Sequence, residues 1–167
     1  LMAQTDRATL TTAYLNNFAT YTQWPEDWIT DSFRIAVIDP SYELLNALDQ
    51  YARNRKINQL SVALYNLGSE TALRTRDYHM ILLPGNRSAL LPRVYDAIAD
   101  RPILLVSEDY PDKRNIMINL FGSAENGLLF EVNEANIINQ GLTIDPEVLL
   151  AGGSTLDVAR LYRESQQ

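Results

Sequence analysis

Apolar residues at the start of the chain recur with the spacing of a helix that buries one face. One stripe, with spacings of four, four and three residues, consists of Leu10, Tyr14, Phe18 and Tyr21. Proline disfavours the helical conformation in the residue before it, so Pro25 is predicted to end this helix at Trp24. The first element is therefore predicted to be an amphipathic helix with aromatic side chains near its end.

Further along the chain, short apolar runs bounded by turn residues predict strands. These runs lie at residues 33–38, 60–65, 78–83, 102–106, 115–121 and 128–133. Helical patterns are predicted after Asp39 and from a Ser88 cap to about Ala99. A turn-rich connection over residues 122–127 favours a hairpin between the last two strands. This order predicts an α/β fold, a sandwich in which helices flank a mixed sheet, mostly parallel with an antiparallel hairpin near the C-terminal third.

The domain organisation predicted from the sequence is simple. No linker or composition break divides residues 1–167, so one domain is expected. Residues 154–167 are mostly polar with apolar side chains at Leu156, Ala159 and Leu161, and a helical tail on the surface is predicted there. The alternative is a lead-in to a partner or to a further domain.

Charge and composition exclude several classes of function. The net charge is −7, from 14 basic and 21 acidic residues, so binding to nucleic acid or to anionic lipid is not expected. No apolar run approaches the roughly 18 residues that a membrane span requires, so no membrane insertion is predicted. The chain has no cysteine, which excludes disulfides, thiolate chemistry and cysteine-based metal sites.

Candidate catalytic residues are few. His79 is the only histidine and no Gly-x-Ser-x-Gly elbow is present, so neither a nucleophilic triad nor a catalytic zinc site is predicted. Three carboxylates follow predicted strands and are expected to border one crevice of the sheet: Asp39, Glu108 and Asp109. Solvated loop acids are the preferred interpretation of these residues, and an acid–base pair or a magnesium site is the alternative. We expect no enzymatic activity, no metal and no cofactor.

Two segments are candidates for binding. Gly85, Asn86, Arg87 and Ser88 lie between a strand and a helix, where free backbone N–H groups can hold an anion. Tyr21, Trp24 and Trp28 gather aromatic side chains in a short window. They serve either core packing and loop anchoring or a contact surface for a protein or a small apolar ligand.

The two ends of the chain carry a set of short sequence motifs in a fixed order. The first motif is a helix with Asn17-Phe18 followed by Trp24-Pro25. The later ones are Ile116-Met117-Ile118-Asn119-Leu120, Phe130-Glu131-Val132-Asn133, Gly141-Leu142 and Leu149-Leu150. In this order the motifs resemble those of the YfiR-like family of bacterial periplasmic regulators, and the resemblance spans roughly residues 8–150. It departs from the family pattern at Arg114-Asn115 and at 151–153, and in its lack of cysteine. Structural roles are expected for Asn17, Phe18, Trp24, Pro25, Asn119, Glu131 and Asn133.

The resemblance implies a non-enzymatic protein of the periplasm, with its signal peptide removed. It also implies that the protein modulates a membrane-bound signalling partner, such as a diguanylate cyclase or a histidine kinase, through the partner's periplasmic part. Homodimerisation is one form that association can take. Two alternatives stay open: a small-ligand-binding module of a transporter or sensor system, and an enzyme that uses the strand-end carboxylates.

Overall fold

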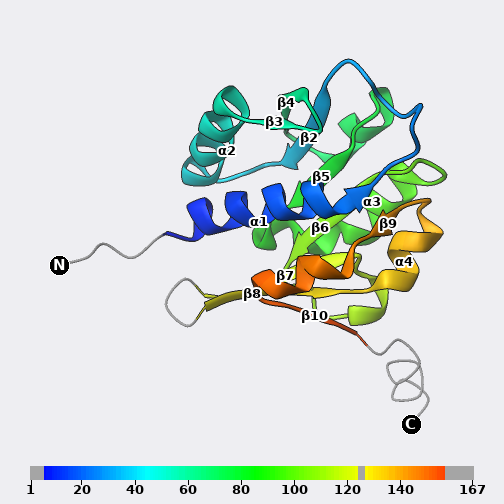
Figure 1. The fold of residues 1–167 in the computed structure, drawn as a ribbon. Coiled ribbons are helices and arrows are strands. Elements are labelled where there is room, and N and C mark those ends of the chain that lie inside the picture. Colours follow the sequence, from blue (N-terminus) through cyan, green and yellow to red (C-terminus); the bar gives the residue numbers. More distant parts are fainter. Residues whose placement is uncertain (1–5, 124–126, 157–167) are drawn as a thin grey trace, which may run out of the picture.

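A curled eight-stranded sheet forms the centre of the molecule (Figure 1). The structure is a computed structural model that describes residues 6–123 and 127–156. In sheet order the strands are β10 (Gly153–Thr155), β8 (Gly127–Val132), β7 (Ile118–Ser123), β6 (Leu104–Glu108), β5 (Met80–Leu83), β2 (Phe33–Ile38), β4 (Leu60–Leu67) and β3 (Lys56–Ile57). A two-stranded sheet pairs β1 (Thr22–Gln23) with β9 (Thr143–Ile144).

The central strands of the sheet are parallel, and its edges are mixed. β4, β2, β5, β6 and β7 run in one direction. β3 is antiparallel to β4 and β8 is antiparallel to β7, whereas β10 is parallel to β8. β7 and β8 form the hairpin. These pairings confirm the predicted α/β fold with a mostly parallel sheet and an antiparallel pair near its end.

Helices cover both faces of the sheet. α1 (Arg7–Tyr21) packs beside α2 (Tyr42–Asn54). α3 (Leu91–Ile98) packs with the 3₁₀ helix η1 (Glu70–Thr75). The β2–α2–β4 and β5–α3–β6 connections run in opposite directions along the sheet, and right-handed crossovers of this kind put their helices on opposite faces. α4 (Glu134–Asn139) follows the hairpin, and the remaining 3₁₀ helices are η2 (Gly85–Leu90), η3 (Lys113–Asn115) and η4 (Pro146–Ala151).

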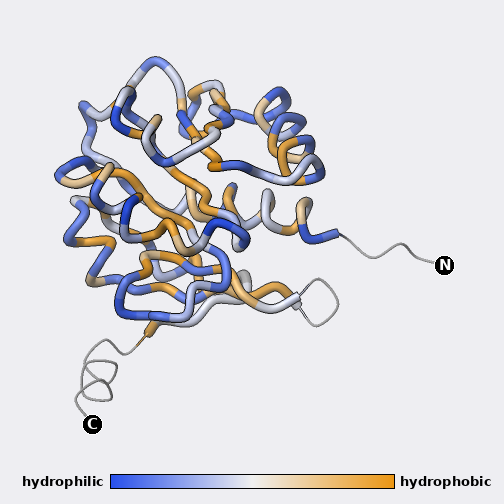
Figure 2. Tube along the Cα trace, turned by 180° about the vertical axis from the view of Figure 1, so that it is seen from behind, coloured by the Kyte–Doolittle hydropathy of each residue, from blue (hydrophilic) through white to orange (hydrophobic). Residues whose placement is uncertain are grey.

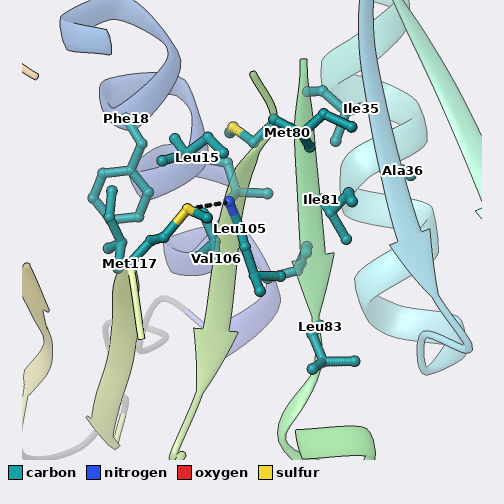
Figure 3. Close-up of a cluster of buried hydrophobic side chains, with 14 of the residues drawn as sticks. Leu15, Phe18, Ile35, Ala36, Met80, Ile81, Leu83, Leu105, Val106 and Met117 are labelled. Atoms are coloured by element: carbon teal, nitrogen blue, oxygen red, sulfur yellow. Dashed lines mark hydrogen bonds between the residues drawn. The ribbon is translucent and has the colours of Figure 1, made fainter. Parts of the chain in front are cut away.

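One part of the core lies between α1 and the parallel strands (Figure 3), and the buried residues of α3 belong to the same cluster. Phe18 and Leu15 of α1 point toward Leu105 of β6 and Met117, the residue before β7. Every residue of β5 and β6 is buried, as expected for parallel strands that are covered on both faces. Colouring by hydropathy shows the same central strands as predominantly apolar (Figure 2).

The first helix differs from its prediction in two respects. Its buried residues are Thr11, Thr12, Leu15, Phe18 and Ala19. Of the predicted stripe only Phe18 is fully buried, because the helix face that packs on the sheet is rotated away from that stripe. The hydroxyl of Tyr14 donates instead to the main-chain carbonyl of Leu128. The helix ends at Tyr21 and not at Trp24, since Thr22 and Gln23 leave the helix to pair with β9.

Two further predictions about helices are wrong. Ser88 caps no helix: residues 85–90 form η2, and α3 begins after Leu90 with a proline in its first turn. The helical tail predicted from residue 154 is incorrect at its start, because Gly153–Thr155 pair with Phe130–Val132 as an edge strand. Residues 157–167 of that predicted tail lie outside the described part of the chain.

Candidate functional site

A crevice opens at the carboxyl edge of the parallel strands, which is the edge where β2, β4, β5, β6 and β7 end. β2 and β5 are neighbours, and their connections lead away to opposite sides, so this is the point where the strand order reverses. Open α/β sheets bind ligands at such switch points. The crevice has a volume of about 560 Å³. Its walls come from the start of α1, the start of α2 and the segments that follow β5 and β6.

Glu108 and Arg7 form the most buried ionic contact of the crevice. Glu108 ends β6 and is 7% exposed. Arg7 donates from Nε (3.2 Å) and Nη2 (3.0 Å) to Oε2 of Glu108, and from Nη1 (2.6 Å) to the main-chain carbonyl of Gly122. Burial raises the pKa of Glu108, while Arg7 opposes that shift and Asp109 adds to it. This pair ties the first turn of α1 to the ends of β6 and β7.

The three carboxylates predicted to follow strands all lie at the carboxyl edge of the sheet, but in two separate places. Glu108 and Asp109 line the crevice, in agreement with their expected placement. Asp39 pairs instead with Arg87, whose Nε lies 2.7 Å from its Oδ2. Asp39 and Asp109 both follow their strands with positive φ, of 46° and 54°, a conformation that aspartate tolerates. The chain therefore turns sharply after β2 and after β6.

Only part of the predicted anion-binding segment, residues 85–88, lies in the crevice. Gly85 and Asn86 line the crevice. Ser88 does not, and the guanidinium of Arg87 is engaged by Asp39. No sequence pattern predicts Arg7 as a residue of this crevice, because its partner Glu108 lies 101 positions away in the sequence.

The aromatic segment lies at the opposite edge of the sheet, where the parallel strands begin. Trp24 and Trp28 each donate from Nε1 to a main-chain carbonyl, of His79 and Tyr78 respectively, both at 3.0 Å. Both indoles are partly buried. They line a groove of about 570 Å³ together with Pro25. Tyr21, at the end of α1, is partly buried but lies outside the lining of this groove.

His79 has a structural place beneath this aromatic segment. It is 4% exposed and its ring stacks on Phe33, with 4.4 Å between centroids. Trp24 packs edge-on against both rings. Nδ1 of His79 accepts the backbone N–H of Arg34 at 3.0 Å, so the imidazole is neutral. Burial lowers its pKa to about 4.

The polar motif residues of the hairpin form one connected network. Asn119 accepts at Oδ1 from Ser107 Oγ (2.9 Å) and from the backbone N–H of Tyr110 (3.1 Å). Its Nδ2 donates to Glu131 (3.1 Å), which also pairs with Lys113. Asn133 caps α4 and donates to the carbonyl of Lys113 at 3.1 Å. These contacts hold the segment after β6 against the hairpin.

Two other motif positions lie on α1. Phe18 is fully buried and meets Phe130 edge-on at 4.8 Å. Asn17 is partly buried and faces the groove between α1 and α2. Within the described residues, no group of three or more acidic, histidine or cysteine side chains is arranged to hold a metal ion. In the same part of the chain, no helix has the length and hydropathy needed to cross a membrane.

Comparison with known proteins identifies the family. Residues 8–152 match the family model described as YfiR/HmsC-like, and the chain therefore belongs to this family. The resemblance seen in the sequence motifs is confirmed. The family comprises regulatory, generally non-enzymatic proteins of the periplasm that act on cyclic-di-GMP signalling partners.

Other comparisons add little. No curated protein matches the sequence significantly. Among solved structures, YbdL from Escherichia coli, reported with a methionine aminotransferase function, is similar with a TM-score of 0.44 and 10% identity. That alignment covers 95% of this chain and 44% of YbdL. A structural similarity this weak supports no conclusion about the function of this chain.

Proposed function

We propose that this protein is a periplasmic regulator that binds the periplasmic part of a membrane-bound signalling protein and modulates it. The partner is a diguanylate cyclase or a sensor histidine kinase, and the protein itself catalyses no reaction. Membership of the YfiR/HmsC-like family carries the proposal. A regulator of this kind works by binding its partner differently in two states, which requires a recognition surface and no catalytic site.

The partner-binding surface that we propose is formed by Tyr21, Trp24 and Trp28. Partly exposed aromatic side chains are enriched at the centres of protein interfaces. Both indoles are held by hydrogen bonds to the backbone before β5, so they keep their orientation without a partner. Such preorganisation lowers the entropic cost of binding. The same surface supports homodimerisation, because a two-fold contact places one patch on both subunits.

The test is a binding measurement with the purified periplasmic segments of membrane-bound diguanylate cyclases and sensor histidine kinases from the same organism. Calorimetric titration is expected to give a saturable complex, and Trp28→Ala is expected to weaken it at least tenfold. Tyr42→Ala is the matched control, since Tyr42 is an aromatic residue, 81% exposed, at the start of α2 near the other edge of the sheet. A folded protein that ignores cyclase and kinase segments alike would contradict the proposal.

A further inference from the structure

We propose that the outer side of β4 binds an extended, acidic segment of a partner protein, which adds a strand to the sheet. β3 and β4 lie at one end of the sheet (Figure 1), and β3 pairs with β4 only along residues 60–61. Residues 62–66 pair with β2 on their inner side and with no strand of the described residues on their outer side. The proposal concerns the backbone of β4, and it does not depend on the aromatic surface proposed above.

The backbone groups of alternate residues of β4 point away from the sheet. The carbonyl of Leu67 accepts the N–H of Asp39 at 2.8 Å, so the backbone groups of Leu67 face β2. Because these groups alternate in direction along a strand, those of Val62, Leu64 and Asn66 face outward. Within the described part of the chain, none of these three residues forms a backbone hydrogen bond on the outer side. Open N–H and C=O groups of this kind are a template for a further strand.

The strand itself carries none of the features that usually protect an exposed edge. Soluble proteins place charged residues, proline or a bulge on such an edge, or keep the edge strand short. β4 has eight residues and includes no charged residue, proline or glycine. Several of its apolar side chains are partly exposed, among them Val62, Leu64, Tyr65 and Leu67. β4 therefore offers apolar area together with open hydrogen-bonding groups, which is the combination that docking by strand addition uses.

The charges beside this edge favour an acidic segment. Lys56 lies opposite Ser61, at the point where β3 stops covering β4. The guanidinium carbon of Arg76 lies 4.5 Å from the centroid of the Tyr65 ring, beside the open stretch. Both cations are exposed, and neither forms an ion pair within the described residues. In a chain with a net charge of −7, two unpaired cations at one edge attract carboxylates of an incoming segment.

A second copy of this chain fits the edge less well than an acidic segment. A two-fold antiparallel contact centred on Leu64 would bring the Arg76 side chains of the two copies toward each other, because each lies over the neighbouring Tyr65. Like charges across a strand pair are destabilising. The charges therefore favour a partner of opposite charge over self-association through β4.

The experiment is a calorimetric titration of the purified full chain with the peptide acetyl-Glu-Val-Glu-Val-Glu-Val-amide at low ionic strength. We expect saturable binding that weakens at high salt, because screening reduces the attraction. The matched peptide acetyl-Lys-Val-Lys-Val-Lys-Val-amide has the same apolar residues with the opposite charge, and it is expected to bind at least tenfold more weakly. Tighter binding of the lysine peptide, or no binding of either peptide, would overturn the proposal.

Hydrogen exchange followed by NMR locates the peptide on the unmodified protein. The N–H groups of Val62, Leu64 and Asn66 are expected to gain protection in the complex. Those of Ala63 and Tyr65 face β2 and are expected to be protected already. Binding that leaves the exchange of the three outward groups unchanged would refute the assignment to this edge.

A pair of variants separates the backbone from the side chain. Asn66→Pro removes one outward N–H and leaves the hydrogen bonds to β2 in place, and proline is tolerated on an edge strand at such a position. Asn66→Ala is the matched control, since it loses the same exposed side chain and keeps the N–H. Only Asn66→Pro is expected to weaken peptide binding at least tenfold. Equal binding by the two variants, with cooperative unfolding of both, would contradict strand addition. Light scattering that shows a dimer in the unmodified protein and a monomer in Asn66→Pro would assign the edge to a second copy and overturn the proposal.

Discussion

The indole N–H of Trp24 donates a 3.0 Å hydrogen bond to the main-chain carbonyl of His79, joining the segment after the first helix to the start of a central strand. The two side chains also pack edge-on, with 5.5 Å between ring centroids. One tryptophan therefore fixes both the backbone and the ring of the residue before β5. This relationship makes Trp24 a structural residue, whatever else its exposed part does.

Truncation of Trp24 is expected to destabilise the fold. Burying a tryptophan in a core contributes about 3–5 kcal/mol, and we expect about 2–3 kcal/mol for Trp24→Ala because this ring is partly exposed. Trp24→Phe keeps most of the packing and loses the hydrogen bond, which costs about 1 kcal/mol. Urea denaturation of the three proteins measures both differences. An unchanged midpoint for Trp24→Ala would show that the ring serves only the surface.

The stability of the protein is expected to fall as the pH decreases from about 6.5 towards 4. Burial lowers the pKa of His79 from 6.5 to about 4, with Arg34 lowering it further and Asp31 and the carbonyl of Ile29 opposing. In this window the unfolded chain binds the proton more readily than the folded one, so acid favours unfolding. The full effect is about 2–3 kcal/mol.

Urea midpoints measured between pH 7 and pH 4 test this dependence. His79→Gln removes the titrating group, so its free energy of unfolding is expected to change less across the window, whatever its absolute value. Glu108 contributes with the opposite sign, because its raised pKa favours the folded state in acid. Both the wild type and His79→Gln contain Glu108, so its contribution cancels when their curves are compared. Parallel curves for both would mean that His79 is not the group responsible.

Much of the fold can be predicted from local pattern, and the reason is physical. β5 and most of β2 and β6 are apolar because parallel strands are buried on both faces, and such runs are visible in a sequence. β1 and β9 are only two residues long and carry no pattern, so their pairing, which ends α1 early, was not predictable. The edge strand β10 replaced a predicted helix for the same reason.

The candidate site was predictable only in part. Carboxylates that follow parallel strands meet at one edge of the sheet, and this placed Glu108 and Asp109 correctly. The two ion pairs of that edge depend on tertiary packing. Arg7 reaches Glu108 from the first turn of a distant helix, and Arg87 turns to Asp39 across two strand ends. The spacing of residues along the chain therefore predicts neither ion pair.

A methyl group at residue 153 is expected to detach the edge strand β10. A Cβ at Gly153 would lie 2.3 Å from the ring of Phe130, which is fully buried and has no room to move. Overpacking of this kind costs about 1–3 kcal/mol. Gly68→Ala is the control, because a Cβ there meets nothing within 4 Å and the backbone has no positive φ. Hydrogen exchange is expected to show loss of protection in residues 153–155 for Gly153→Ala alone, and equal protection in both variants would contradict the clash.

Removal of Lys113 is expected to destabilise the hairpin through the carboxylate that it leaves behind. The side chain of Glu131 is 9% exposed and that of Lys113 is 32% exposed. Breaking a buried pair costs about 3–5 kcal/mol, and we expect about 2 kcal/mol for Lys113→Met because the lysine is partly solvated and Asn119 still donates to Glu131.

The double variant Lys113→Met/Glu131→Gln distinguishes the loss of the ion pair from the cost of leaving the carboxylate of Glu131 buried without its partner. Its glutamine is neutral, so most of the loss in Lys113→Met is expected to be recovered, and the two substitutions are not additive. Arg53→Met is the control, since the Arg53–Asp49 pair is exposed and such pairs contribute about 0–1 kcal/mol. Chemical denaturation of the wild type, Lys113→Met, Glu131→Gln and the double variant gives the coupling energy. A coupling near zero would mean that Lys113 stabilises the hairpin by packing on Phe121, where its Nζ lies 5.6 Å from the ring centroid, and not by neutralising Glu131.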